Sequence, residues 1–281
     1  MNLCEALRVL GGMQLNYKVH GEGFPLVILH GLFGNLDNWS TIARQWADHF
    51  KVILVDLRNH GRSPHANEMT YPLMAQDLAA FLEEQGIDRC HLLGHSMGGK
   101  VAMQCALDYP TLVEKLIVVD MAPRRYGRGH DDVFAALKAL DPKDIEDRRH
   151  ADELMAPHMA DEGVRMFLLK NLARDSKDGF RWRMNLEVLD QEYENLIAPV
   201  GTAGQTFPGQ ALFIRGGNSG YVEDDDMDVI EHHFPQVKLI TIADAGHWVH
   251  AEQPEELYAS VKTFLDRPAE RVHGVVPDMG E

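Results

Sequence analysis

The sequence contains few cysteines, and the three that it has are far apart. Cys4, Cys90 and Cys105 are odd in number. Their spacing matches neither a disulfide framework nor the CxxC pairs of a metal site. We therefore expect reduced, mostly buried thiols and no bound metal ion.

Long apolar runs are also missing. No stretch approaches the roughly 18 consecutive apolar residues that a membrane helix needs. The first residues, MNLCE, do not combine a basic region with an apolar run, as a secretory signal would. These absences predict a soluble, cytoplasmic protein that has no membrane partner.

Positive charge is scarce relative to negative charge. The chain has 27 Lys and Arg against 43 Asp and Glu, a formal net charge of −16. So acidic a surface repels phosphate backbones, which argues against a nucleic-acid partner. The 281 residues, 45% of them hydrophobic, are enough for one large α/β domain or two small ones.

What the sequence does have is an alternation of apolar strands and amphipathic helices. Stretches such as residues 74–84 place apolar side chains on one helical face. Residues 12–20 alternate and predict an antiparallel edge strand. The pattern predicts an α/β fold with a mostly parallel sheet, helices on both faces, and ligands at the carboxyl ends of the strands. The buried strands are expected at residues 26–30, 52–56, 91–94, 116–120, 212–215 and 237–242.

The alternation of strands and helices stops after Asp120. Helical patterns follow at residues 132–140, 143–155 and 162–172, and the Pro- and Gly-rich residues 198–209 predict a linker back to the sheet. So long an excursion at the carboxyl edge favours a lid over a plain crossover connection. We expect a core of residues 12–122 and 206–266, a helical lid of residues 123–205 and a loose tail of residues 267–281.

The sequence GHSMGG at residues 94–99 matches the pattern G-x-S-x-G. It stands directly after the strand at residues 91–93 and before a helical run at residues 100–107, as a nucleophile elbow requires. A tight turn there holds Ser96 in strained geometry and points a helix N-terminus at the reaction centre. Ser96 is therefore the candidate nucleophile, with a glycine-rich turn carrying an incidental serine as the alternative.

A serine hydroxyl needs a base within hydrogen-bonding reach. His247 lies after the last expected strand and before the expected final helix at residues 254–265, so it reaches the same edge as Ser96. His250, three residues later, competes with it, and either histidine could instead be a packing residue. Gly246 lets the backbone approach closely and favours His247.

These motifs, in this order, resemble the α/β-hydrolase superfamily over nearly all of residues 12–265. The matching pieces are HGLFG at residues 30–34, DLRNHGRS at residues 56–63, the serine elbow and Gly246-His247. The resemblance implies an oxyanion hole formed by the backbone N–H groups of Leu32 and Met97, with Phe33 as the alternative to Leu32. Residues 56–63 are interpreted as a structural turn.

The acid does not stand where most of the family has it. The loop after the penultimate strand is Gly-Gly-Asn-Ser at residues 216–219, and the aspartates at 224–226 come later and fit a solvated helix start. Asp120 ends the strand after the elbow helix, and Ser96, Asp120, His247 is the order that the fold requires. We assign the acid to Asp120, with an N-cap or loop aspartate as the alternative.

An acid on this earlier strand resembles the YbfF-type esterase branch of the superfamily. The match extends through residues 98–100, 119–123, 167–170 and 246–252. The resemblance implies that the acid and the helical lid both follow the sixth strand.

The resemblance implies a serine hydrolase of EC class 3.1. It would cleave carboxylic esters, or acyl thioesters, of small to medium acyl chains through an acyl-enzyme intermediate. It would need no cofactor and act as a monomer or homodimer. Expected substrate contacts are Phe33, Arg124, Trp182 and Trp248. Arg124 and Arg125 could meet an anionic leaving group such as a coenzyme A phosphate, or form a solvated basic pair.

Other activities share this fold. Ser96 argues against haloalkane dehalogenases and epoxide hydrolases, which use an aspartate nucleophile. Carbon–carbon bond hydrolases and perhydrolases keep a serine triad. The two alternatives that we carry forward are an acyltransferase that passes the acyl group to an alcohol and a ligand receptor with little turnover.

Overall fold

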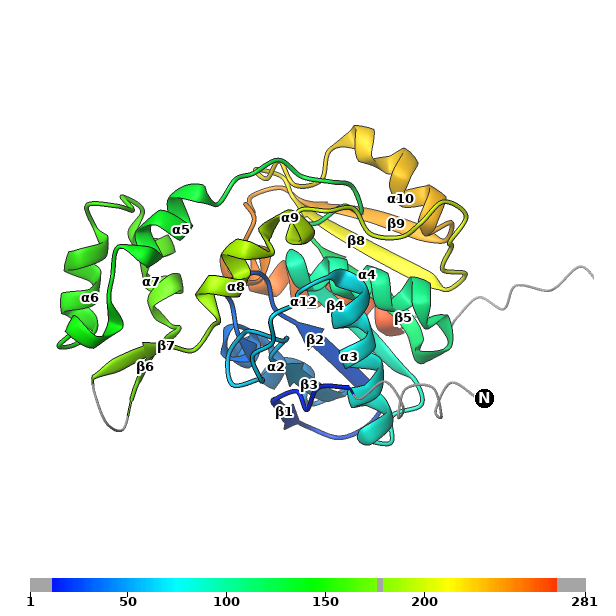
Figure 1. Cartoon of the computed structure of the whole chain (residues 1–281). Helices are drawn as coiled ribbons and strands as arrows, with labels where there is room; N and C mark the ends of the chain where they lie inside the picture. The colour runs from blue at the N-terminus through cyan, green and yellow to red at the C-terminus, as the bar shows by residue number, and fades with distance from the viewer. Residues whose placement is uncertain (1–11, 176–178, 267–281) are drawn as a thin grey trace, which may run out of the picture.

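The β-branched and leucine-rich runs form one seven-stranded sheet in the computed structural model, which describes residues 12–175 and 179–266 (Figure 1). The strand order is β1-β3-β2-β4-β5-β8-β9, and only β1 runs antiparallel to its neighbour. The predicted edge strand is therefore confirmed, although it is shorter than expected. The strands are β1 (Tyr17–His20), β2 (Pro25–Leu29), β3 (Lys51–Val55), β4 (Cys90–His95), β5 (Val113–Val119), β8 (Gln210–Gly216) and β9 (Val237–Ile242).

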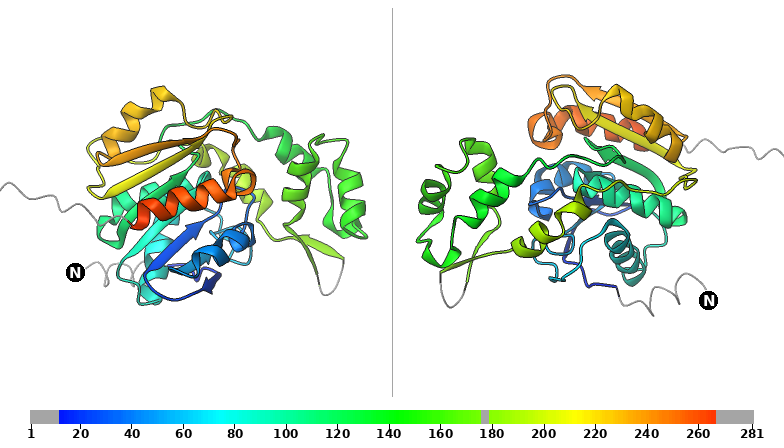
Figure 2. Two further views of the ribbon diagram at one scale, coloured as in Figure 1. Left: turned by 180° about the vertical axis from the view of Figure 1, so that it is seen from behind. Right: turned by 45° about the horizontal axis from the view of Figure 1, so that its top comes forward.

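Helices cover both faces of this sheet (Figure 2). One face packs against buried side chains such as Trp46 and Leu257, and the other against Leu78 and Val101. Because the central strands are buried on both sides, they read as continuous apolar runs in the sequence. The first face carries α2 (Ser40–Trp46) and α12 (Pro254–Asp266), and the second carries α3 (Tyr71–Glu84), α4 (Met97–Asp108) and α10 (Met227–His233). Shorter elements are η1 (Leu36–Trp39), η2 (Pro110–Leu112), η4 (Asp224–Asp226) and α11 (Val249–Glu252).

A long insertion separates β5 from β8 and extends to one side of the sheet (Figure 1). Buried side chains on it, such as Phe134 and Leu168, belong to the same apolar cluster as the helices of the second face. The insertion is thus packed onto the core. Its elements are α5 (Asp131–Lys138), η3 (Pro142–Asp144), α6 (Arg148–Met155), α7 (Glu162–Leu169), β6 (Leu172–Arg174), β7 (Phe180–Trp182), α8 (Leu186–Gln191) and α9 (Tyr193–Leu196).

Two details of the insertion differ from the sequence prediction. Strands β6 and β7 pair as a small antiparallel sheet. Each strand has only three residues, which is too short for an alternation of apolar and polar residues to predict it. The helix expected from residue 143 begins only at Arg148. There the Asp147 side chain accepts the His150 N–H and caps the helix.

The insertion follows the fifth strand of the described chain, β5, so the count of six carried over from the family exceeds the observed count by one. The division at residues 123 and 205 into core and lid stays a prediction. The expected tail at 267–281 lies outside the described residues, as does Cys4, whereas Cys90 and Cys105 are buried free thiols. Within the described residues, no helix combines the length and the apolar character needed to cross a bilayer.

Candidate active site

Ser96 stands at a sharp turn between the end of β4 and the start of α4. Its backbone has φ 54° and ψ −122°, an unfavourable region for a residue with a side chain. The neighbouring glycines make the turn possible: a Cβ on Gly94 would lie 2.1 Å from the Gly98 carbonyl oxygen, and one on Gly98 would lie 2.5 Å from that of His30. The turn therefore fixes where the Ser96 hydroxyl points.

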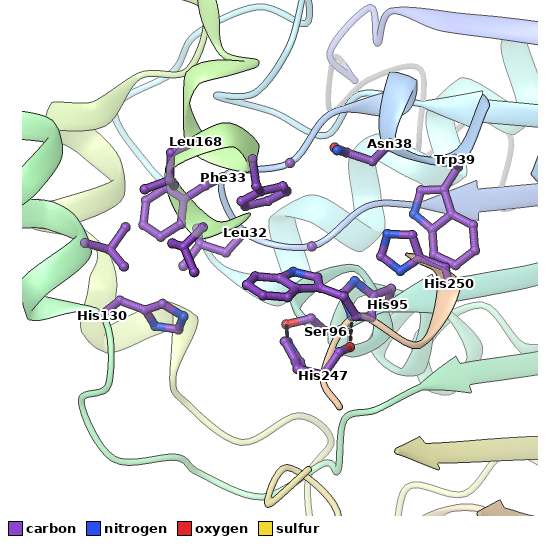
Figure 3. Close-up of a pocket in the computed structure, with 16 residues that line it drawn as sticks. Leu32, Phe33, Asn38, Trp39, His95, Ser96, His130, Leu168, His247 and His250 are labelled. Carbon is purple, nitrogen blue, oxygen red and sulfur yellow. Dashed lines mark hydrogen bonds between the residues drawn. The ribbon is translucent and has the colours of Figure 1, made fainter. Parts of the chain in front are cut away.

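Ser96, His247 and Asp120 form a chain of hydrogen bonds, of which Figure 3 shows the first. The Ser96 Oγ lies 3.0 Å from His247 Nε2, and His247 Nδ1 lies 2.7 Å from Asp120 Oδ2. Because a carboxylate only accepts, Nδ1 carries the proton and Nε2 of the neutral ring is left to accept from the hydroxyl. The three residues come from the ends of β4 and β5 and from the loop after β9.

Asp120 is fully buried, and its backbone has φ 51°. Its Oδ1 accepts the N–H of Gly216 at 2.9 Å, and its Oδ2 accepts the Ser219 hydroxyl at 2.5 Å as well as His247 Nδ1–H. A buried carboxylate is tolerated when such donors replace water. Ser219 thus stands in the loop where most of the family carries its acid, and supplies a hydroxyl to an acid from another strand.

Two further groups hold His247 in place, and the sequence did not single out either. The Tyr221 ring stacks on the imidazole, with 3.8 Å between ring centroids and 19° between planes. The His95 Nε2–H donates to the His247 carbonyl oxygen at 2.8 Å (Figure 3). Burial, with His250 and His247 nearby, lowers the pKa of His95 well below its ordinary value, so its ring is neutral.

His250, the competing candidate base, makes different contacts. Its ring stacks on Trp39, with 4.4 Å between centroids and 18° between planes. Burial first, and then the charges of His247 and Lys170, lower the pKa of His250 to about 3. The Ser96 hydroxyl therefore donates to His247 Nε2, whereas the His250 ring packs against Trp39.

The expected oxyanion donors lie beside Ser96. Phe33, the alternative donor, has its N–H directed to His60 Nε2 at 3.3 Å. Burial, and then the charge of the nearby His30, lower the pKa of His60 to about 3. The His60 ring is therefore neutral, and its Nε2 remains an acceptor. Within the described part of the chain, the N–H groups of Leu32 and Met97 have no protein acceptor, so they are free to bind a developing oxyanion.

Two cavities meet at Ser96. The lining of the first includes the apolar side chains of Phe33 and Leu168 (Figure 3), those of Phe167 and Trp248, and four histidines. The second has a volume of about 400 Å³ and no acidic residue in its lining. Of the expected substrate contacts, Phe33 and Trp248 line the first cavity and Arg124 lines the second. Trp182 lines neither. The second cavity is lined by residues including Tyr71, Lys100, Arg124, Tyr126, Tyr193 and Tyr221.

Arg124 and Arg125 do not form a solvated pair. The Arg124 guanidinium lies 4.2 Å from the Tyr126 ring centroid, and its Nε donates to Asp226 at 2.6 Å. Asp226 is buried, which corrects its expected place in a solvated helix start. The exposed Arg125 instead pairs with Glu194. The Asp226 carboxylate is buried in this pair, whereas the Arg124 side chain is 32% exposed.

The structure also shows what residues 56–63 do. Asp56 accepts the N–H groups of Leu36 and Arg62 and the Asn16 amide, at 2.7 to 2.9 Å. These bonds are those of a structural turn. Among the described residues, no group of three His, Cys, Asp or Glu side chains is arranged to hold a metal ion.

Comparison with known proteins gives several matches. The family described as the alpha/beta hydrolase fold matches residues 25–254. Esterase YbfF of Escherichia coli is 42% identical over 243 residues, which cover 86% of this chain and 93% of that protein. The sn-1-specific diacylglycerol lipase ABHD11 of Danio rerio is 38% identical over 273 residues, 93% of this chain and 85% of that protein. The solved structure of a marine microorganism esterase superposes with a TM-score of 0.88 at 39% identity, covering 90% of this chain and 100% of that one.

Proposed function

Because the chain belongs to the α/β-hydrolase family and is a carboxylesterase-type hydrolase, we propose that it cleaves esters through an acyl-enzyme intermediate on Ser96. The observation that carries this proposal is the chain of hydrogen bonds from Ser96 through His247 to the buried Asp120. A serine hydroxyl becomes a useful nucleophile only when a base of this kind can remove its proton.

In the first half of the reaction, Ser96 Oγ attacks the ester carbonyl while His247 Nε2 takes the hydroxyl proton. The N–H groups of Leu32 and Met97 stabilise the resulting oxyanion, and one such donor is typically worth about 10²–10³ in turnover. His247 then gives the proton to the leaving oxygen. Asp120 holds the imidazole in the required tautomer and stabilises its positive form.

In the second half, water replaces the leaving alcohol. His247 takes a proton from that water, and the resulting hydroxide attacks the acyl carbon. The tetrahedral intermediate collapses, releases the acid and returns the proton to Ser96 Oγ. No cofactor takes part in this scheme.

The two cavities suggest how a substrate divides. We assign the acyl chain to the first cavity, where Phe33, Phe167 and Trp248 supply apolar walls suited to small and medium chains. The alcohol part then occupies the second cavity, next to Arg124. Acyl thioesters are the second substrate class in this proposal, since a guanidinium can meet an anionic leaving group.

The test is a chain-length profile with p-nitrophenyl esters and acyl-coenzyme A thioesters, run on the wild type and on Ser96→Ala. The variant should lose about 10⁴-fold or more in kcat, whereas Ser260→Ala, on α12, should keep wild-type turnover. Ester hydrolysis that survives in Ser96→Ala would contradict the proposal. Inert thioesters would remove the second substrate class.

Two product measurements separate the remaining alternatives. If added alcohol diverts most of the acyl group into a new ester, the protein is an acyltransferase. If a fluorophosphonate labels the protein but no ester is turned over, the receptor alternative gains support. Free acid as the main product is the result that we expect.

A further inference from the structure

Lys100 is a buried lysine with unusual partners. It lies one helical turn after Ser96, and its backbone N–H donates to the Ser96 carbonyl at 3.2 Å. The residue is 1% exposed. Within residues 12–175 and 179–266, no carboxylate lies within ion-pair distance of its Nζ, although buried lysines are ordinarily paired. A charge placed there needs an explanation other than an ion pair.

The Nζ donates instead to three backbone carbonyls. They belong to Arg124 at 2.8 Å, Ala198 at 2.5 Å and Ile197 at 3.5 Å. An ammonium group has three N–H donors, so three carbonyls can satisfy it. The rings of Tyr71 and Tyr126 lie 5.4 and 4.8 Å from the Nζ and add cation–π contacts.

These carbonyls come from both ends of the insertion. We call residues 123–126 the first stem, where the chain leaves the sheet domain, and residues 197–200 the second stem, where it returns. The stems also bind each other: the Tyr126 N–H donates to the Ile197 carbonyl and the Val200 N–H to the Pro123 carbonyl, each at 2.9 Å. The Lys100 side chain therefore joins the helix that begins after Ser96 to both stems, and Gln104 of the same helix accepts the Gly201 N–H just beyond the second stem.

We propose that Lys100 is a positioning residue that fixes both stems against the helix following the nucleophile and so sets the width of the second cavity. The inference rests on the proposed function of Ser96. Arg124, Tyr126 and Ile197 of the stems line that cavity together with Ser96 and Lys100 itself. If the stems moved away, a bulky substrate in the second cavity would lose its contacts with them.

The protonation of Lys100 bears on the strength of this contact. Burial, and then the charges of Arg124 and Arg125, lower the pKa of Lys100 to about 7. The other groups that face it are the Tyr71 ring from α3 and the Tyr126 ring from the first stem. Above its pKa the amine has two donors for three carbonyls, so the stems are held less firmly.

The test compares Lys100→Met with Lys115→Met. Lys115 is a matched control because it is also buried, and its Nζ donates to the carbonyls of Phe264 and Leu265, away from Ser96. Hydrogen exchange of the Tyr126 and Val200 amides is measured in both variants. We expect these amides to exchange about tenfold faster in Lys100→Met and at the wild-type rate in Lys115→Met.

Kinetics supply the second readout. For 1-naphthyl butyrate, KM should rise about tenfold in Lys100→Met and stay within about twofold of the wild-type value in Lys115→Met. In the wild type, KM for the bulky ester should also rise between about pH 6 and about pH 8. Lys100→Arg, which keeps its charge, should lose this rise.

The outcomes separate this inference from the proposed function. Stem amides that exchange at the wild-type rate in Lys100→Met, or equally faster in Lys115→Met, would overturn the role of Lys100 whether or not the protein hydrolyses esters. An unchanged KM for the bulky ester, or the same pH dependence in Lys100→Arg, would overturn it too. If Lys100→Met does not fold, Lys100→Gln, which keeps a neutral donor, takes its place. Hydrolysis that survives in Ser96→Ala would count against the proposed function alone.

Discussion

Asp120 is a fully buried carboxyl group, and three donors surround it. It lies at a positive φ, which directs its carboxylate toward Gly216, Ser219 and His247. Each donor replaces part of the hydration that burial removes. The same donors fix the carboxylate plane, and the carboxylate in turn orients the imidazole.

The first prediction concerns the place of the acid. Asp120→Asn keeps the shape of the side chain but lets the amide donate to His247, which favours the wrong tautomer. A loss of about 10⁴ in kcat is expected from such a change. Asp224→Asn is the control, because Asp224 pairs with Arg215 at the surface. The measurement is steady-state turnover of a short ester in both variants. A large loss of turnover in Asp224→Asn alone would assign the acid to Asp224 instead of Asp120.

The second prediction concerns Ser219. Ser219→Ala removes one donor from Asp120, so the carboxylate and imidazole should become less well oriented. We expect kcat to fall about tenfold and KM to stay within about twofold, together with a loss of about 1–3 kcal/mol in the free energy of unfolding. Asn218→Ala, in the same loop, is the control. A wild-type kcat in Ser219→Ala would show that the hydroxyl has no part in orienting the acid.

At the scale of elements, two loops at the carboxyl edge are joined by neutral histidines. His30 follows β2, and its Nε2 accepts the Leu57 N–H at 3.1 Å, while His60 follows β3 and accepts the Phe33 N–H. Each bond links the loop after one strand to the loop after its neighbour. Because an acceptor nitrogen cannot be protonated without losing its bond, the loop carrying Leu32 depends on both rings staying neutral.

The third prediction follows from this neutrality. The pKa of His60 is about 3 in the folded protein and about 6.5 in the unfolded chain. As pH falls below about 6.5, only the unfolded state takes up the proton, so stability decreases, by about 2 kcal/mol at about pH 5. His60→Gln should therefore lose less stability between pH 7 and pH 5 than wild type or His49→Gln, in which an exposed histidine changes. Urea unfolding measures this, and equal losses in all three proteins would contradict it.

Some elements could be predicted from the sequence because their signal is local. The central strands are buried on both faces, and residues 94–99 join strand, turn and helix in one short motif. The hairpin of β6 and β7 escaped prediction because each strand has only three residues. The helix expected from residue 143 was predicted to begin too early, because the helical periodicity of the sequence extends to the N-terminal side of the Asp147 cap.

Other features of the site depend on the fold and could not be predicted. Ser219 contacts Asp120 across 99 positions of sequence. Lys100 contacts carbonyls, which every residue has, so no side chain near Arg124 or Ala198 signals its partners. Asp120 could be chosen only because the loop where the family usually places its acid carries no carboxylate.

At the scale of the whole molecule, the sheet and the insertion together build a site that neither would form alone. The ends of β4 and β5 and the loop after β9 supply the hydrogen-bonded chain, and the insertion supplies walls for both cavities. The second cavity carries Lys100 and Arg124 inside a molecule of net charge −16. Overall charge therefore does not describe the surroundings that a substrate would meet near Ser96.

Covalent labelling tests whether Ser96 is the nucleophile of an ester hydrolase. The most direct measurement is labelling with a fluorophosphonate, followed by intact mass and peptide mapping, with residual turnover of p-nitrophenyl butyrate measured in the same samples. One adduct per chain is expected, on the peptide that contains Ser96, with activity lost in proportion to labelling and no adduct in Ser96→Ala. An adduct on another residue, or full activity in protein labelled at Ser96, would contradict it.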